Sequence, residues 1–224
     1  MSDIDILELK ADIINDNDEK AAEIRERLKR EHTFFVNIMG SPGAGKTTML
    51  IETIKSLKES GDCKIGVIEA DVDCDTDSRA VYELGVEVVQ VHTGGSCHMD
   101  ASMTQKALDR LGSAGFDVIF LENVGNLVCP AEFDIGASLS VMLLSLPEGD
   151  DKPLKYPLMF TVSDIILISK CDTKPVFDFD ETAFRRNVAG LKNDAKIIPL
   201  SFKNGENTGE WFGLITRILK EKGF

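Results

Sequence analysis

The sequence predicts a three-layer α/β fold, in which helices cover both faces of a mostly parallel central sheet. Short, nearly continuous apolar runs alternate along the chain with segments of helical periodicity, and such runs are typical of parallel strands that are buried on both faces. Because 43% of the 224 residues are apolar, the chain can bury a core large enough for one domain. We therefore expect one α/β domain, at residues 33–224, preceded by a short arm.

The expected arm occupies residues 1–32. Its apolar residues are spaced as on one face of a helix, at Ile6, Leu9, Ile13, Ile24 and Leu28. This spacing predicts one or two amphipathic helices, with a break at the polar residues 15–18. We expect the arm to pack on the main domain or on a partner subunit.

The elements of the main domain follow from the same alternation. The apolar runs predict strands at residues 34–39, 65–68, 86–91, 118–121, 139–146, 165–168 and 197–200. The helical patterns between them predict helices at residues 49–57, 78–84, 99–111, 154–162, 181–191 and 208–222. Ligands of parallel sheets bind at the carboxyl ends of the strands, so the loops there should carry the chemistry.

The loop after the first strand fits the pattern G-x-x-x-x-G-K-S/T, between a strand and a helix as that pattern requires. Its glycines let backbone N–H groups turn towards a phosphate, Lys46 adds an ammonium group, and the hydroxyl of Thr47 can bind Mg²⁺. The sequence therefore predicts a nucleoside-triphosphate site. The residues of this phosphate loop are Gly40, Ser41, Pro42, Gly43, Ala44, Gly45, Lys46, Thr47 and Thr48.

Carboxylates end two of the predicted strands. Glu122 follows strand 118–121, and with Gly125 it forms a D-x-x-G switch in which Glu replaces Asp. Glu122 would hold Mg²⁺ or its waters, and Gly125 would bring an N–H group to the γ-phosphate. After strand 65–68, Asp71 would contact Mg²⁺-bound water or orient the attacking water. Asp77 is a second candidate for the same role in that acidic segment.

The segment Ser169-Lys170-Cys171-Asp172 follows strand 165–168 and nearly matches N-K-x-D. Asp172 can accept from the ring N–H and the exocyclic amine of guanine, a donor pair that adenine lacks, so the segment favours GTP. Lys170 would lie along the base plane. Ser169 replaces the usual Asn, and we expect the loop to lose the brace that the Asn amide provides.

The segment Ser201-Phe202-Lys203 follows the last strand. It would either give backbone N–H groups to the guanine carbonyl or form an ordinary turn.

Two further loops contain soft metal ligands, Cys97 with His98 and, in the loop after Glu122, Cys129. Thiolate and imidazole groups are ligands that Zn²⁺ and Ni²⁺ favour. Spacing alone also allows a structural role, because an isolated cysteine often belongs to the core. One chain offers three ligands, so water or a second protomer would complete a four-coordinate site.

The overall composition limits the partners. The formal net charge is −13, which disfavours nucleic acid and anionic membranes. No signal-type segment or apolar run of membrane-spanning length is visible, so we expect a soluble, cytoplasmic protein. The five cysteines are scattered and contain no Cys-x-x-Cys pair, which argues against a disulfide framework.

Several segments together resemble the HypB family, the nickel-insertion GTPases of nickel–iron hydrogenase maturation. The pairing of Cys97-His98 with Glu-Asn-Val-Gly-Asn-x-x-Cys-Pro is specific to that family. The segments that carry the resemblance are residues 40–47, 93–100, 122–130, 148–151 and 169–172.

This resemblance implies a GTP-dependent homodimer of the signal-recognition and partition-ATPase class. Its Ni²⁺ or Zn²⁺ site would be shared between protomers and formed by Cys97, His98 and Cys129 of both. It also implies two partners, a nickel-delivery accessory protein and the precursor of the hydrogenase large subunit. Lys155 would reach the nucleotide across the dimer or remain a surface lysine. The chain has three histidines, so nickel storage is not expected.

Three alternatives remain open. A urease-type nickel GTPase shares the chemistry, but its metal motif is Cys-x-His with proline between, whereas Cys97 and His98 are adjacent. A small-molecule kinase would need a lid with arginines, and arginine is sparse between residues 80 and 168. A metal-dependent adaptor would bind nucleotide without turnover. The lack of an evident arginine finger predicts slow intrinsic GTP hydrolysis.

Overall fold

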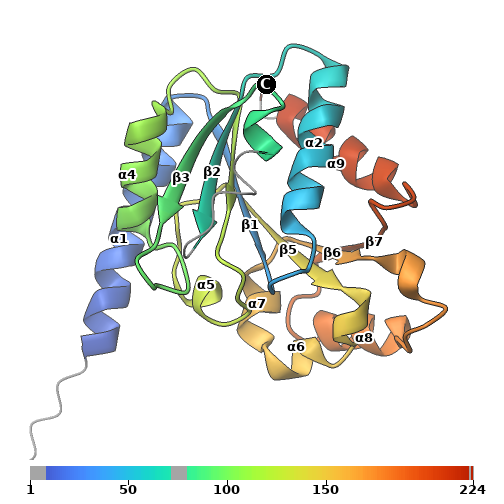
Figure 1. The fold of residues 1–224 in the computed structure, drawn as a ribbon. Coiled ribbons are helices and arrows are strands. Elements are labelled where there is room, and N and C mark those ends of the chain that lie inside the picture. Colours follow the sequence, from blue (N-terminus) through green and yellow to red (C-terminus); the bar gives the residue numbers. More distant parts are fainter. Residues whose placement is uncertain (1–8, 72–79, 222, 224) are drawn as a thin grey trace, which may run out of the picture.

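A parallel sheet forms the centre of the molecule (Figure 1). The computed structural model describes residues 9–71, 80–221 and 223, with side chains from residue 14 onward except at Asp71. Within these residues the sheet has seven strands in the order β3-β2-β4-β1-β5-β6-β7, and every neighbouring pair is parallel. The strands are β1 (Phe34–Gly40), β2 (Ile65–Asp71), β3 (Glu87–His92), β4 (Val118–Glu122), β5 (Leu139–Ser145), β6 (Ile165–Ser169) and β7 (Lys196–Pro199).

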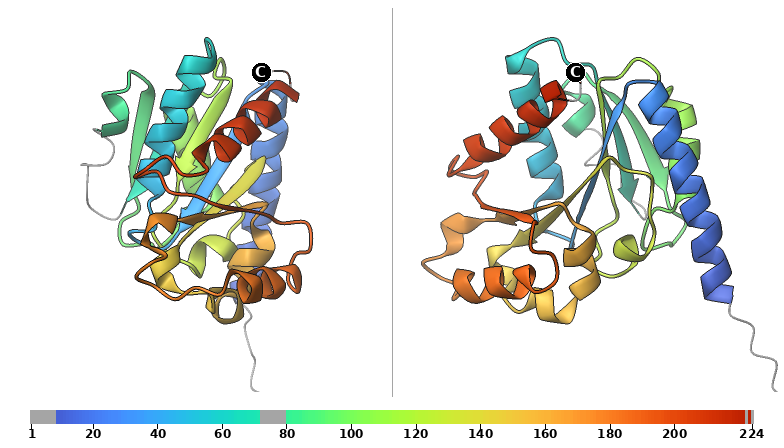
Figure 2. Two further views of the ribbon diagram at one scale, coloured as in Figure 1. Left: turned by 90° about the vertical axis from the view of Figure 1, so that its right-hand side faces the viewer. Right: turned by 180° about the vertical axis from the view of Figure 1, so that it is seen from behind.

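Helices on both faces of this sheet complete three layers, which confirms the predicted fold class (Figure 2). Short 3₁₀ turns also follow β5 (η1, Leu146–Glu148) and β6 (η2, Cys171–Thr173), and residues 80–82 are helical. The α-helices are α1 (Leu9–Arg30), α2 (Lys46–Ser60), α4 (Ala101–Leu111), α5 (Cys129–Glu132), α6 (Lys152–Lys155), α7 (Pro157–Val162), α8 (Glu181–Ala189) and α9 (Thr208–Glu221). No helix among the described residues combines the length and the apolarity needed to cross a membrane.

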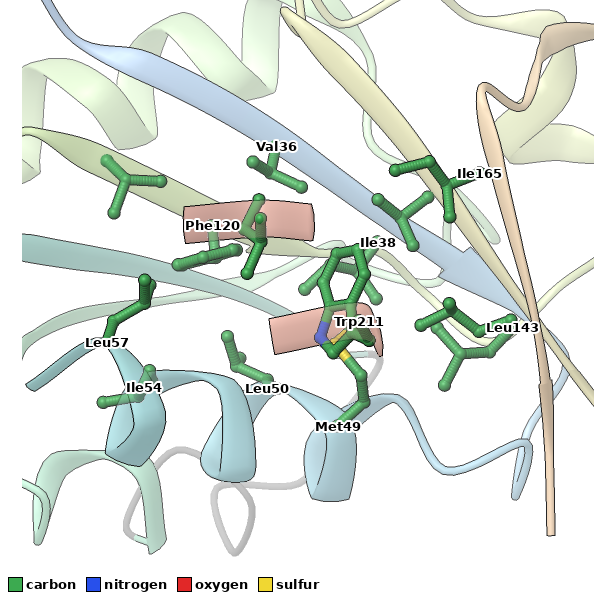
Figure 3. Packing of buried hydrophobic residues seen from close by; sticks show 14 of the residues in the cluster. Val36, Ile38, Met49, Leu50, Ile54, Leu57, Phe120, Leu143, Ile165 and Trp211 are labelled. Carbon is green, nitrogen blue, oxygen red and sulfur yellow. The ribbon is translucent and has the colours of Figure 1, made fainter. Parts of the chain in front are cut away.

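Alternate residues of β1 belong to different core clusters. Val36 and Ile38 pack with α2 and α9, as Figure 3 shows, whereas Phe35 belongs to the cluster of α1 and α4. Trp211 of α9 is fully buried, and its indole N–H donates to Thr53 of α2 at 2.8 Å. This bond fixes α9 against α2, the helix that follows the phosphate loop.

The helix α1 lies beside α4 on the opposite face of the sheet (Figures 1 and 2). It buries Ala21, Ile24 and Leu28 and runs without interruption, so the predicted break at residues 15–18 is wrong. Polar side chains weaken a helix by bonding to their own backbone. The Asn17 side chain instead bonds to Asp134 and to α4, outside its own helix.

Two other boundaries differ from the prediction. The expected helix at residues 154–162 is divided into α6 and α7, because Pro157 opens a new helix and disfavours helical geometry at Tyr156 before it. The strand β5 ends at Ser145, since Leu146 already belongs to the 3₁₀ turn η1. The helix expected at residues 78–84 lies partly outside the described residues.

Candidate nucleotide and metal sites

The phosphate loop joins β1 to α2, as expected from its motif. Gly40 has a φ of 147°, and a Cβ atom there would collide with the carbonyl oxygen of Leu143. Gly45 has a φ of 98° and precedes the first residue of α2. Both positions therefore need glycine. The loop leads directly into the N-terminus of a 15-residue helix, which favours binding of an anion.

The side chains of Lys46 and Thr47 are held close to the loop. The Lys46 ammonium group lies 3.4 Å from the carbonyl oxygen of Gly40 and 3.3 Å from that of Ser41, and the residue is 7% exposed. The Thr47 hydroxyl donates to Glu122 at 3.0 Å. A hydroxyl and a carboxylate are hard oxygen ligands, so this pair fits the chemistry of Mg²⁺.

The other two acidic candidates are less fully described. Asp71 ends β2, two strands from β1 in the sheet order, at the same carboxyl edge as Glu122. Its side chain is not described, and Asp77 lies outside the described residues.

The segment after β4 is bound to the phosphate loop. The N–H of Asn126 donates to the carbonyl of Gly40 at 3.1 Å. Gly125 lies so close to Pro42 that an added Cβ atom would be 2.9 Å from the proline nitrogen. The switch segment and the phosphate loop therefore touch through backbone atoms.

Cys97, His98 and Cys129 come together at the same edge of the sheet, with ligand atoms all within 4.8 Å of one another. The Cys97 and Cys129 sulfurs are 2.7 Å apart, and the Cys97 sulfur is 3.9 Å from Nδ1 of His98. The His98 ring stacks on Phe133 with ring centres 4.0 Å apart and an interplanar angle of 18°. We call these three residues the thiol–imidazole cluster; it could bind Ni²⁺ or Zn²⁺.

Burial, hydrogen bonding and neighbouring charges shift the pKa values of His98 and Cys129 in this cluster. Burial lowers the pKa of His98 despite opposing effects of Asp100 and Glu132, so the imidazole tends to be neutral, the form that binds metal. The hydrogen bond with Cys97 is the largest of the effects that raise the pKa of Cys129. Metal binding would displace the Cys129 proton.

Two asparagines connect the cluster to the nucleotide side. Asn126 donates from its side chain to the carbonyl of Cys97 at 3.5 Å and accepts from the N–H of Val128 at 2.9 Å. Asn123 is 1% exposed and accepts from the N–H of Met99, the residue after His98, at 3.1 Å. The segment that contacts the phosphate loop therefore also contacts both cysteine loops.

The candidate base-recognition loop, residues 169–172, is held against the phosphate loop by two side chains. The hydroxyl of Ser169 donates to the carbonyl of Ala44 at 2.6 Å, so the expected loss of a brace to the loop is wrong. Lys170, with a φ of 59°, donates to the carbonyl of Gly43 at 2.6 Å. These contacts join the end of β6 and the residue after it to the phosphate loop.

The side chain of Asp172 is held by the following loop. Ser201 donates to it at 2.6 Å and the Lys203 ammonium lies 3.6 Å away; the Ser201 hydrogen bond is the main reason that the pKa of Asp172 is lowered. The N–H groups of Ser201 and Lys203 bond within this loop, to Glu206 and to the Ser201 hydroxyl. Ser201 thus orients Asp172 with its side chain.

Lys155 lies on the surface, with a side chain that is 57% exposed and paired with Asp151. The expected contact of Lys155 with the nucleotide would be made across a dimer, to a nucleotide bound by a second chain, and it stays a prediction.

Some residues of the sites carried no clear sequence signal. Glu148 was visible only within the segment 148–151 of the resemblance, without a role of its own; it accepts hydrogen bonds from Ser41 of the phosphate loop and from Ser145. Phe133 stacks on His98, and nothing in its sequence context indicates that role. Asn123 was visible only as part of the motif around Glu122, where its neighbours carried the argument.

The fold, the phosphate loop and its neighbouring carboxylate define a phosphate-loop nucleotide-binding protein. Residues 34–199 match the family model described as CobW/HypB/UreG, nucleotide-binding domain. A solved signal recognition particle receptor FtsY from Elizabethkingia anophelis has a TM-score of 0.53 at 15% identity, over 87% of this chain and 74% of that one. That likeness concerns the fold alone.

Closer relatives narrow the family. The hydrogenase maturation factor HypB of Azotobacter chroococcum is 42% identical over 95% of this chain and 69% of its own. The hydrogenase/urease maturation factor HypB of Helicobacter pylori is 42% identical over 86% and 79%. A crystal structure of Helicobacter pylori HypB in complex with nickel has a TM-score of 0.85 at 39% identity, over 92% of this chain and 96% of that one. The chain belongs to the HypB family, and by that family it is a nucleotide-binding maturation factor.

Proposed function

We propose that this chain is a metallochaperone that hydrolyses GTP and delivers nickel during maturation of nickel–iron hydrogenase. In this proposal the metal site lies at the interface of a GTP-dependent homodimer. One observation carries the proposal: the segment from Glu122 to Cys129 contacts the phosphate loop and also contains a member of the thiol–imidazole cluster.

Residues 33–224 form the GTPase domain in this proposal, and residues 1–32 form an arm. The phosphate loop and Gly125 bind the phosphates, while Asp172 and Lys170 bind guanine. Thr47, Glu122 and Asp71 hold Mg²⁺, which when bound neutralises charge on the phosphates. The hydrogen bond between Thr47 and Glu122 supports the Mg²⁺ assignment.

Hydrolysis needs a group that orients the attacking water, and we assign it to Asp71 or Asp77. The reaction is slow in isolation because the sequence offers no evident arginine finger. Such a finger contributes a factor of roughly 10³ to 10⁵ in other GTPases.

The coupling between nucleotide and metal follows from contacts. A γ-phosphate that accepts a hydrogen bond from the N–H of Gly125 draws this residue towards the phosphate loop, where Gly125 already touches Pro42. Asn126 then moves with it and shifts the carbonyl of Cys97, to which it donates. Cys129 lies four residues after Gly125 and shifts as well. The nucleotide state therefore changes the separation of the metal ligands.

The cargo is Ni²⁺, and Zn²⁺ can use the same ligands. Three ligands per protomer leave the coordination incomplete, so the cluster of a second protomer or water completes it. The nickel complex of the Helicobacter pylori relative supports nickel as the cargo. The names of the relatives support a hydrogenase as the client, and the Helicobacter pylori name adds a urease as the alternative client. The resemblance to the family adds a nickel-delivery accessory protein to the proposed partners.

The decisive experiment titrates Ni²⁺ into the full chain with GDP and with a non-hydrolysable GTP analogue, and measures molecular mass in each state. We expect a dimer with the analogue, a changed nickel affinity, and loss of that site in Cys97→Ala. Cys63→Ala is the matched control, because Cys63 lies outside the cluster. Equal nickel affinities in the two nucleotide states would refute the coupling. A monomer whose nickel binding ignores Cys97 would refute the shared site.

A further inference from the structure

Asn17, in the middle of α1, has a buried side chain with bonds to two different loops. Its amide nitrogen donates to the carbonyl of Asp134 at 2.8 Å, and its amide oxygen accepts from the N–H of Ala101 at 2.8 Å. The residue is 8% exposed. Both polar atoms of the amide are therefore used, and neither bonds within α1.

The two partners of this amide are close in sequence to members of the thiol–imidazole cluster. Ala101 is three residues after His98 and begins α4. Asp134 directly follows Phe133, whose ring stacks on His98, and lies five residues after Cys129. A single side chain from α1 thus joins the loop of Cys97 and His98 to the loop of Cys129.

The helix that carries Asn17 is fixed against the same segment. The guanidinium of Arg25 pairs with the carboxylate of Asp134 and donates to the carbonyl of Ala137 at 3.3 Å. Gly136 lies so close to α1 that an added Cβ atom would be 2.7 Å from the carbonyl oxygen of Ala21. These contacts therefore fix the position of α1 relative to the loop that follows Cys129.

Packing alone does not account for an asparagine here. Asparagine is a poor helix former because its side chain competes for backbone bonds, and an apolar residue would fill the same buried position. An amide at this place has a use because it satisfies a backbone donor of one loop and a backbone acceptor of the other.

We propose that Asn17 is a positioning residue of the metal site, which sets the separation between His98 and Cys129 from outside both loops. This inference rests on the proposed function, in that the cluster binds nickel. Asn17 does not contact the metal; it orients the ligands through Ala101, Asp134 and Phe133. Groups that hydrogen-bond directly to metal ligands typically affect affinity 10- to 100-fold. Asn17 acts through intervening residues, so we expect an effect at the lower end of that range.

The test compares Asn17→Ala with Arg27→Ala in the full chain. Arg27 anchors the other end of α1 through Asp109 and Ser113, away from the cluster. Ni²⁺ titration, the nickel–thiolate absorption spectrum and the melting temperature are measured for each. We expect Asn17→Ala to bind nickel about tenfold more weakly with a shifted spectrum. Arg27→Ala should lower the melting temperature and leave both nickel readouts unchanged.

A further variant protects the test against misfolding. Asn17→Asp can still accept from Ala101 but cannot donate to Asp134, and we expect an intermediate loss of affinity. If Asn17→Ala does not fold, wild-type affinity in Asn17→Asp overturns the inference.

Three further outcomes contradict the assignment, and they are distinguishable. Nickel binding by Asn17→Ala that equals wild type overturns the positioning role. Equal losses in Asn17→Ala and Arg27→Ala also overturn it, because they show that only the docking of α1 matters. Wild-type nickel binding that survives Cys97→Ala instead overturns the proposed metal site, and the inference with it.

Discussion

The phosphate loop and the thiol–imidazole cluster are built in different ways. Residues 40–48 form a continuous segment whose geometry follows from glycines at positive φ and from the helix that begins at Lys46. The cluster takes its ligands from two loops separated by 30 residues of chain, and Cys97 meets Cys129 only in the fold. One site is local, whereas the other depends on tertiary structure.

This difference shows where each site is sensitive to change. A local loop is damaged by substitutions within its own motif. An assembled cluster is also damaged by substitutions that displace one loop relative to the other. Here the segment after β4 leads to Cys129 and is also bonded, through Asn123 and Asn126, to the loop of Cys97 and His98. The following predictions separate the two kinds of site.

Lys46→Ala should have the largest effect. Loss of the ammonium removes the main side-chain charge on the phosphates, and we expect GTP hydrolysis to fall by about 10²- to 10³-fold. Nickel affinity of the nucleotide-free protein should stay at the wild-type value. Phosphate release and nickel titration measure the two effects, with Lys55→Ala on the exposed side of α2 as control. A loss of nickel binding without nucleotide would show that the sites are not separate.

Cys129→Ser should damage the other site. It removes one of three soft ligands, and we expect nickel affinity to fall by at least about 100-fold. Basal GTP hydrolysis without metal should be unchanged, since Cys129 does not contact the phosphate loop through its side chain. Isothermal titration and phosphate release are the measurements. Slower metal-free hydrolysis in this variant would contradict a purely metal-binding role.

Gly125→Ala tests the connection between the two sites. The added methyl group would lie 2.9 Å from the ring Cγ and the nitrogen of Pro42, so one segment must move. We expect GTP affinity to fall by about tenfold, or roughly 1.4 kcal/mol, and the nickel affinity to become equal with GDP and GTP analogue. Gly209→Ala is the matched control, because no heavy atom lies within 4 Å of its added methyl group. Retained nucleotide dependence in Gly125→Ala would locate the coupling elsewhere.

Ser169→Ala should have a smaller effect, on the base loop. It leaves the carbonyl of Ala44 without its hydroxyl donor, which costs about 1 kcal/mol. We expect GTP to bind a few-fold more weakly, with nickel affinity of the nucleotide-free chain unchanged. Fluorescent nucleotide titration with GTP and ATP measures it. Wild-type GTP affinity would show that Lys170 braces the loop alone.

The smallest expected effect is on the alkylation of Cys63 and Cys171. Their reactivity distinguishes these partly buried thiols from the exposed thiol of the thiol–imidazole cluster. Burial raises the pKa of Cys63 and of Cys171 to about 11, so little thiolate is present at pH 8. We expect iodoacetamide to leave both unmodified at pH 8 and to react increasingly as the pH rises through 10. Mass spectrometry locates the labels, and the exposed Cys97 serves as the reference. Fast labelling of Cys63 at pH 8 would contradict the raised pKa of its thiol.

Some elements could be predicted from the sequence and others could not, for physical reasons. The strands were visible because a buried parallel strand is apolar along most of its length, as the fully buried β1 and β6 show, in which Asn37 and Ser169 are the polar residues. The break in α1 was wrong because polar residues 15–18 look like a helix end, whereas Asn17 has partners over 80 residues away. Ser169 was misread because a hydroxyl can replace an amide only at a suitable distance from its acceptor.

The sequence by itself determined the α/β class, the phosphate loop, the strand-end carboxylates and the resemblance to HypB, because each depends on short-range periodicity or on a contiguous motif. The resemblance also implied that Cys97, His98 and Cys129 form one site, and the structure shows that their side chains meet within one chain. Only the tertiary structure decided that Asn123 and Asn126 join this cluster to the phosphate loop. It also showed that Phe133 stacks on His98 and that Asn17 bonds to Ala101, three residues after His98. Such contacts join segments that are distant in the chain, and their distances follow from the packing of helices on the sheet.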